Sequence, residues 1–310
     1  MHGYRKLASE IGSGLLTFPI THFDKQLHFD EDAYRKHCDF LLQHPFAAIF
    51  AAGGTGEFFS LTPSETSSIV RAAVAETGGR VPVVAGCGYG TAIACEMARE
   101  AETSRADAIL LLPPYLVQAS QEGLARHVEA VCRSTGLGVI LYGRDNCRVS
   151  PATLSALCEA CPNLIGYKDG IGDVELFVAQ KTLISDRLVY IGGLPTAEVF
   201  AAPYLAMGCS TYSSAIANFA PDLALKFYDA IRSGDLDQTS AILENFILPY
   251  VEIRNLGAGY AVAIVKAAMR VIGRGAGPVR PPLDDLRPEH YLQLEALISR
   301  CMEGLLVRSP

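Results

Sequence analysis

The chain has 310 residues, of which 50% are hydrophobic, and it carries a formal net charge of -7 with a pI near 5.5. This length and composition suit either one α/β barrel or two smaller domains. The acidic balance and the lack of any block of lysines or arginines argue against nucleic acid as a partner. The amino terminus has no apolar signal core, and no apolar run reaches the roughly 18 residues that span a bilayer, so we expect a soluble cytoplasmic protein with no membrane partner.

Cysteine and histidine spacing gives no sign of a metal site. The nine cysteines are scattered without the density of a small secreted disulfide framework, so we expect reduced core residues. Cys158 and Cys161 have CxxC spacing, but no second pair or nearby histidine completes a zinc site, and core packing explains them better. The seven histidines include no HExxH motif. We therefore expect chemistry without a metal or any other cofactor.

Eight strand-like apolar runs follow one another along the chain, and each leads into a segment with helical periodicity or a helix start signal. The predicted strands are residues 15–21, 47–52, 81–85, 108–112, 138–142, 164–168, 188–191 and 209–212. Eight such units with short connections predict a (β/α)₈ TIM barrel, here over residues 1–232. Residues 233–310 show helical periodicity over 236–250, 258–272 and 288–303, with no low-complexity linker before them. They predict a C-terminal helical extension packed on the barrel.

Lys168 ends one of these apolar runs, directly before Asp169 and Gly170. A poorly solvated ammonium has a lowered pKa, and the free amine can form a Schiff base with a ketone. Alternatively, Lys168 pairs with Asp169 at a solvated strand end. The run alone does not decide between the two.

The ends of the other predicted strands favour the covalent role. In a barrel of this kind all the carboxyl ends of the strands meet at one mouth. The residues that the sequence places there are Gly53 to Glu57 after the second strand, Tyr115 after the fourth, Tyr142 at the fifth, Lys168 at the sixth, Gly192 and Gly193 at the seventh, and Ser213 and Ser214 at the eighth. A lysine in this company is best explained as a nucleophile.

Several of these neighbours have both a functional and a structural interpretation. Backbone N–H groups around Gly54, with the Thr55 hydroxyl, are typical of an anion site, which we favour over the alternative of a tight turn with no ligand. Ser213, Ser214 and Asn218 have the chemistry to bind substrate hydroxyls or a distal carboxylate, or to cap the next helix. We expect Glu57 to bond to groups of its own loop, with an acid–base role as the alternative.

Four motifs carry a resemblance to a known family over nearly the whole chain: Gly53-Gly54-Thr55-Gly56-Glu57, Pro113-Pro114-Tyr115, Tyr142, and Gly166-Tyr167-Lys168-Asp169. The chain resembles the class I pyruvate-aldolase superfamily typified by dihydrodipicolinate synthase and N-acetylneuraminate lyase. Within it, segments 53–60, 142–146 and 211–219 are most similar to the 5-dehydro-4-deoxyglucarate dehydratases, although that branch often has Asn at the place of Gly143. The synthase branch fits less well, because its arginine after the strand-five tyrosine is displaced here.

The resemblance implies a role for each matching position. Lys168 is the Schiff-base nucleophile, Tyr142 is a proton shuttle, and the region of Gly54 and Thr55 binds the keto-acid carboxylate. Gly193 and Ser213 are further candidates for substrate contacts. The resemblance places Tyr115 at a subunit contact, although a surface tyrosine needs no function, and Tyr142 has the simpler alternative of a packed strand-end ring.

The implied activity is a decarboxylating dehydration of 5-dehydro-4-deoxy-D-glucarate to 2,5-dioxopentanoate, CO2 and water in glucarate catabolism. The implied enzyme uses no cofactor and is a homodimer or a homotetramer. One alternative is another Schiff-base keto-acid aldolase or synthase of the same superfamily. A more distant alternative is a non-catalytic protein that binds a sugar acid.

Overall fold

A closed barrel of eight parallel strands lies at the centre of the computed structural model, which describes residues 2–115 and 117–307. The strands are β1 Leu16–Thr17, β2 Ala48–Ala51, β3 Val83–Cys87, β4 Ala108–Leu111, β5 Gly138–Gly143, β6 Leu164–Asp169, β7 Val189–Gly192 and β8 Thr211–Ser214. Each strand pairs with its neighbours in chain order, and β1 closes the barrel by pairing with both β2 and β8. The predicted (β/α)₈ barrel is confirmed.

The strands are apolar on both faces because both faces are buried. Successive side chains of a strand point to opposite sides, so alternate residues fill the barrel interior and the others pack under the helices. The interior includes Ala48 and Phe50 of β2 and Ile140 and Tyr142 of β5. The Phe50 ring stacks on that of Phe18, with ring centroids 4.4 Å apart. The interior is thus a packed core, and the site for chemistry lies at the end of the barrel where the carboxyl ends of the strands meet.

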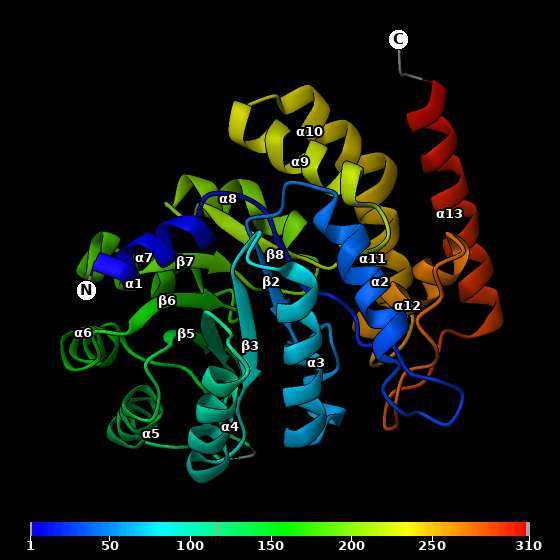
Figure 1. Cartoon of the computed structure of the whole chain (residues 1–310). Coiled ribbons are helices and arrows are strands. Elements are labelled where there is room, and N and C mark those ends of the chain that lie inside the picture. The colour runs from blue at the N-terminus through cyan, green and yellow to red at the C-terminus, as the bar shows by residue number, and fades with distance from the viewer. Residues whose placement is uncertain (1, 116, 308–310) are drawn as a thin grey trace.

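Eight helices follow the strands and surround the barrel (Figure 1). They are α2 Glu31–Leu42, α3 Pro63–Thr77, α4 Thr91–Thr103, α5 Gln121–Arg133, α6 Pro151–Ala160, α7 Val174–Ile184, α8 Ala201–Ala206 and α9 Pro221–Ser233. Local signals define several starts: Thr62 and Glu65 form a capping box at α3, and the Asp30 side chain accepts the Ala33 N–H at α2. The helix predicted over 196–207 is instead a 3₁₀ turn, Ala197–Phe200, followed by the short α8.

The amino-terminal region differs most from expectation. The first strand covers only two residues, because Pro19 has no N–H for a ladder and the Ile20 N–H donates to the Asn218 side chain instead. A helix that the sequence analysis did not predict, α1 His2–Ile11, precedes it. This helix lies against β6 and β7 (Figure 1).

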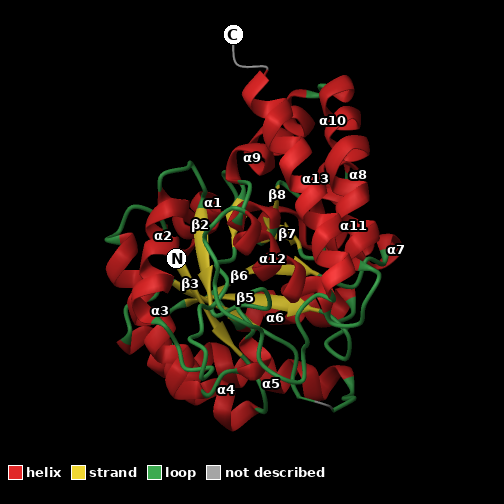
Figure 2. Ribbon diagram, turned by 90° about the vertical axis from the view of Figure 1, so that its right-hand side faces the viewer, coloured by secondary structure: helices red, strands yellow, loops and turns green. Residues whose placement is uncertain are grey.

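Four helices follow the barrel: α10 Leu236–Ile242, α11 Leu248–Arg254, α12 Tyr260–Val271 and α13 Pro288–Val307. The continuous helix predicted over 236–250 is interrupted by a π-helical turn, Leu243–Ile247. Figures 1 and 2 show these helices gathered on one side of the barrel. Buried side chains of α12 share one apolar cluster with those of α9 and with Tyr212 of β8, so the extension packs directly on the barrel. No helix among the described residues is both long enough and apolar enough to cross a membrane.

Candidate active site

Lys168 and Tyr142 face each other inside the barrel, at the carboxyl ends of their strands. They are direct partners in the register of β6 and β5, so their side chains lie on the same face of the sheet. The Lys168 amine lies 3.8 Å from the centroid of the Tyr142 ring, and only 4% of the lysine surface is exposed. The structure thus brings the predicted nucleophile and proton shuttle together.

Both side chains converge on the carbonyl of Gly193, which follows β7. The Tyr142 hydroxyl donates to this carbonyl at 2.8 Å, and the Lys168 amine donates to it at 3.3 Å. A Cβ atom at position 193 would lie 2.6 Å from the Lys168 amine, so glycine is required for the lysine to take this path. Gly193 therefore shapes the site through its backbone.

Burial and the neighbouring charges shift the pKa values of both Lys168 and Tyr142. Burial lowers the pKa of Lys168, which increases the fraction of nucleophilic free amine. Burial alone would raise the pKa of Tyr142, but the positive charges of Lys168 and Arg144 outweigh it and hold that pKa below its usual value. A lysine and a tyrosine shifted in this way can exchange protons nearer to neutral pH.

Asp169, the alternative partner of Lys168, is engaged elsewhere. Its carboxylate accepts the backbone N–H groups of Ile171 and Gly172 and the hydroxyl of Tyr204. It forms no ion pair with Lys168 within the described residues. The simple pairing of neighbours is therefore wrong.

The glycine-rich loop after β2 presents backbone to the same cavity. A Cβ at Gly54 would meet no atom within 4 Å, whereas one at Gly53 would meet the Phe18 ring at 2.9 Å. Among the described residues, the amides of Gly54 and Thr55 donate to no protein acceptor. Two N–H groups and a hydroxyl are thus available to an anion.

Glu57 holds this loop to the C-terminal extension. It has a left-handed backbone, with φ of 60°. Its carboxylate lies 2.7 Å from the Lys266 amine and accepts the Arg280 backbone N–H at 2.9 Å. Within its own loop, the backbone of Glu57 bonds to Gly54 and Ser60, and its carboxylate accepts only the Ser60 hydroxyl, at 3.4 Å. The sequence analysis missed the two partners from the extension.

Seven of the candidate residues line one cavity of about 710 Å³: Gly54, Thr55, Tyr115, Tyr142, Lys168, Gly193 and Ser213. Ser213 donates its hydroxyl to the Gly192 carbonyl at 3.3 Å, which leaves its lone pairs available. Tyr115 is 65% exposed at the rim. The side chains gathered here provide a buried amine, hydroxyl groups and an anion-binding loop.

Two further candidates have structural positions instead. Ser214, next to Ser213 on β8, points away from the cavity, caps the Ala217 N–H and donates to Glu198. Asn218 is fully buried and holds the Ile20 N–H and the Phe18 carbonyl. The helix-capping interpretation is therefore correct for Ser214, and Asn218 supports the segment after β1.

The cavity also contains side chains that the sequence analysis did not select. Arg144 lies 3.4 Å from the Tyr142 hydroxyl, within reach of the reacting centre. Tyr250 and Arg254, four residues apart on α11, line the cavity from the C-terminal extension. Their spacing on one helix face is visible in the sequence, but nothing local indicates which surface that face covers.

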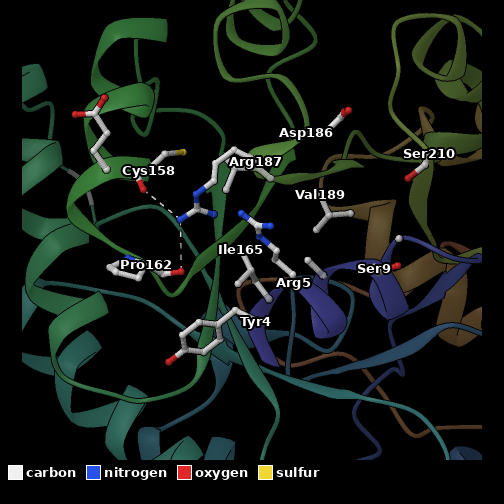
Figure 3. Close-up of a pocket in the computed structure, with 14 residues that line it drawn as sticks. Tyr4, Arg5, Ser9, Cys158, Pro162, Ile165, Asp186, Arg187, Val189 and Ser210 are labelled. Atoms are coloured by element: carbon white, nitrogen blue, oxygen red, sulfur yellow. Dashed lines mark hydrogen bonds between the residues drawn. The ribbon is translucent and has the colours of Figure 1, made fainter. Parts of the chain in front are cut away.

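A second cavity, of about 770 Å³, lies at the opposite end of the barrel (Figure 3). It is bounded by α1 and by the amino-terminal ends of β6 and β7. Figure 3 shows Arg187 there bonded to the carbonyls of Cys158 and Pro162, so its guanidinium is occupied by the backbone. No counterpart of the Lys168 and Tyr142 pair lies among its lining residues. Nor does any group of three or more His, Cys, Asp or Glu side chains in the described parts of the chain have the arrangement of a metal site.

Comparison with known proteins matches the chain to one family over most of its length. The sequence model of the Dihydrodipicolinate synthetase family matches residues 12–301. A protein from Ralstonia nicotianae, described as a probable 5-dehydro-4-deoxyglucarate dehydratase, is 58% identical over 295 residues, which are 95% of each chain. A protein of the same description from Methylobacterium radiotolerans is 58% identical over 293 residues, 94% of this chain and 96% of its own.

Solved structures show the same architecture. Dihydrodipicolinate synthase from Oceanobacillus iheyensis superposes with a TM-score of 0.89 at 25% identity, covering 97% of this chain and 99% of its own. The Escherichia coli K12 prophage protein YagE, solved in complex with pyruvate, has a TM-score of 0.83 at 26% identity, covering 93% and 98%.

Proposed function

The chain belongs to the dihydrodipicolinate synthetase family, and from that premise we propose that it is a lyase that dehydrates and decarboxylates 5-dehydro-4-deoxy-D-glucarate to 2,5-dioxopentanoate, CO2 and water. The observation that carries the chemistry is the buried Lys168 amine, which lies on the Tyr142 ring without a carboxylate partner. The substrate is suggested by the names of relatives 58% identical to this chain. The corresponding biological role is the catabolism of glucarate.

Substrate binding begins with the keto-acid carboxylate at the glycine-rich loop. The free amides of Gly54 and Thr55 and the Thr55 hydroxyl receive it, which places the adjacent ketone towards Lys168 across the mouth. Ser213 takes a substrate hydroxyl, and the bare backbone of Gly193 leaves room for the carbon bonded to the lysine.

The Lys168 amine then attacks the ketone carbon. The new C–N bond forms, the ketone oxygen leaves as water after accepting protons, and a protonated imine remains. Tyr142, which contacts the Lys168 amine through its ring and shares the Gly193 carbonyl with it, relays these protons. Arg144 beside the Tyr142 hydroxyl stabilises the tyrosinate form that a relay requires.

The imine nitrogen serves as the electron sink for the remaining steps. Loss of a proton from the adjacent CH₂ gives an enamine, whose electrons return to expel the β-hydroxyl as water. The extended iminium then accepts the electron pair of the bond to the far carboxylate, which leaves as CO2. Protonation and hydrolysis release 2,5-dioxopentanoate and the free Lys168 amine. Because one lysine serves every step, the proposed reaction requires no metal or organic cofactor.

The proposed enzyme is a homodimer or a homotetramer, as the resemblance implies. Tyr115 suits a subunit contact because a large, 65% exposed aromatic residue lies at the rim of the site. In that arrangement its hydroxyl would contribute to the neighbouring subunit's cavity.

A product assay tests the proposal. We expect 5-dehydro-4-deoxyglucarate to yield equal amounts of CO2 and 2,5-dioxopentanoate, and borohydride to add substrate mass at Lys168. Release of pyruvate without CO2 would identify a retro-aldol lyase instead. Substrate binding with neither product nor adduct would leave only a sugar-acid-binding protein.

A further inference from the structure

We propose that Arg254, from the C-terminal extension, is the residue that selects a diacid by binding the carboxylate farthest from the ketone. This inference rests on the proposed function for the position of the ketone at Lys168. It concerns a different part of the cavity, formed by α11 and the loop after β7.

The bonding of Arg254 makes it suitable for an anion. Its guanidinium donates through Nη1 to the Thr196 hydroxyl at 2.6 Å and to the Pro195 carbonyl at 2.9 Å. Nε and Nη2 donate to the side-chain oxygen of the exposed Asn255 at 3.2 and 3.0 Å, so one Nη2 hydrogen is left for a ligand, and Asn255 is the partner that a carboxylate would replace. All these acceptors are neutral, and no carboxylate among the described residues forms an ion pair with Arg254. The charge of Glu198 acts on Arg254 only from beyond ion-pair distance. A half-buried guanidinium that forms no ion pair gains more from a ligand carboxylate than one that is already paired.

The other cation beside Lys168 is less suited to this role. Arg144 is already paired with Asp145 at 3.2 Å, and it lies against the Tyr142 hydroxyl where protons move. Its place is thus at the reacting end of the substrate. Arg254 lines the cavity beside the loop that follows β7, whereas Arg144 follows β5.

The surroundings of Arg254 hold it in place. Thr196, which accepts one of its N–H groups, is buried and has a left-handed backbone with φ of 52°, a conformation that non-glycine residues adopt mainly at functional or constrained sites. Tyr250 lies one turn earlier on α11 and lines the same cavity. The bonds to the Thr196 hydroxyl and the Pro195 carbonyl orient the guanidinium for binding.

Because the distal carboxylate leaves as CO2, the proposed contact with Arg254 should affect KM and kcat differently. An ion pair with the distal carboxylate is strongest before that group loses its charge, so it stabilises the bound substrate more than the decarboxylation transition state. Replacing Arg254 should therefore raise KM without lowering kcat.

The test compares two six-carbon keto acids that cannot be dehydrated, 2-oxoadipate with a distal carboxylate and 2-oxohexanoate without one. Dissociation constants are measured by calorimetry, and imine formation by borohydride trapping at Lys168. We expect the wild type to prefer 2-oxoadipate and Arg254→Gln to weaken its binding about 10- to 100-fold, the range of a charge-assisted contact, with 2-oxohexanoate unchanged. Arg254→Lys, which keeps the charge but not the planar fork, should lose part of that preference.

A matched control is Arg232→Gln, because Arg232 bonds the Ser210 carbonyl at the other end of the barrel. It should leave both affinities unchanged. Equal weakening of both acids by Arg254→Gln would show that Arg254 only positions the loop after β7 and would overturn the proposal. So would a wild type that binds the two acids equally, whether or not an imine forms. The dehydratase assignment has its own failure, pyruvate in place of CO2, and the two results are separable.

Discussion

Two lysines among the described residues are buried, and their surroundings differ most in whether a carboxylate pairs with the amine. Lys266, within α12, is fully buried and lies 2.7 Å from the Glu57 carboxylate. It also donates to the Pro278 carbonyl at 2.8 Å and lies over the Phe23 ring. Lys168 has a carbonyl at 3.3 Å and an aromatic face, but no carboxylate within ion-pair distance among the residues that the structure describes.

The difference shows how the surroundings of a buried lysine favour either a structural ion pair or a reactive amine. Burial lowers the pKa of both lysines, because removing an ammonium from water is costly. At Lys266 the negative charge of Glu57 opposes that shift and favours the charged form. At Lys168 the charge of Asp169 acts in the same direction but contributes least, because no carboxylate lies within ion-pair distance of the amine among the described residues. In the proposed reaction the amine therefore keeps a lone pair for attack on a ketone. The ion pair that attaches the glycine-rich loop to the extension thus also keeps its lysine unreactive.

The largest expected effect is on turnover in Lys168→Met. Removing the nucleophile should lower kcat at least about 10⁴-fold, as loss of a covalent nucleophile does in other enzymes, and abolish the borohydride adduct. The free energy of unfolding should stay within about 1 kcal/mol of the wild type, because the amine gives up no ion pair and methionine fills a similar volume. Urea unfolding and steady-state kinetics measure the two quantities. A loss of several kcal/mol in stability would mean that Lys168, like Lys266, is a structural cation.

Lys266→Met should produce the opposite profile. It leaves the Glu57 carboxylate buried without a counter-charge, which typically costs about 3–5 kcal/mol of stability. The double variant Lys266→Met with Glu57→Gln is the control, since it removes both charges and should recover part of that loss in urea unfolding. If the double variant were less stable than Lys266→Met alone, the ion pair would not be the source of the effect.

The contrast between the lysines also explains what the sequence can predict. Lys168 is recognisable because its signal is local: an apolar strand ends in a charge and an Asp-Gly turn follows. The regular succession of strands and helices predicts a barrel, and in a barrel the strand ends that carry Tyr142, Gly193 and Ser213 meet at the same mouth. The architecture and the proximity of Lys168 and Tyr142 can therefore be predicted from the sequence.

Lys266 and Arg254 carry no such local signal. Each lies in a helix, and each finds its partner in a distant loop, Glu57 after β2 and Thr196 after β7. The angle at which a helix packs depends on the fit of many side chains, so its spacing alone does not identify the surface it will cover. For the same reason, the short β1 depends on the tertiary partner that the Ile20 N–H finds in Asn218.

The smallest expected effect concerns a second buried carboxyl group, that of Glu198, which can be compared with that of Glu57. Glu57 faces a lysine, whereas Glu198 faces the Ser214 hydroxyl at 2.5 Å, and burial raises the pKa of Glu198 to about 7. The folded protein therefore retains a proton on Glu198 between about pH 4.5 and 7, a range in which the unfolded chain releases it. Stability contributed by this group is full below that range and falls as the pH rises through it, by up to about 3 kcal/mol.

Glu198→Gln should remove this loss, because glutamine stays neutral at every pH. The measurement is urea unfolding of both proteins at pH 5 and pH 7.5. His22 and His37, whose pKa values burial lowers to about 3 and about 4, make stability rise over part of the same range, so the difference between the two proteins is the relevant quantity. That difference should grow with pH in favour of Glu198→Gln. A constant difference would mean that Glu198 is ionised in the folded protein and that a positive charge, for which Arg254 is the candidate, stabilises its carboxylate.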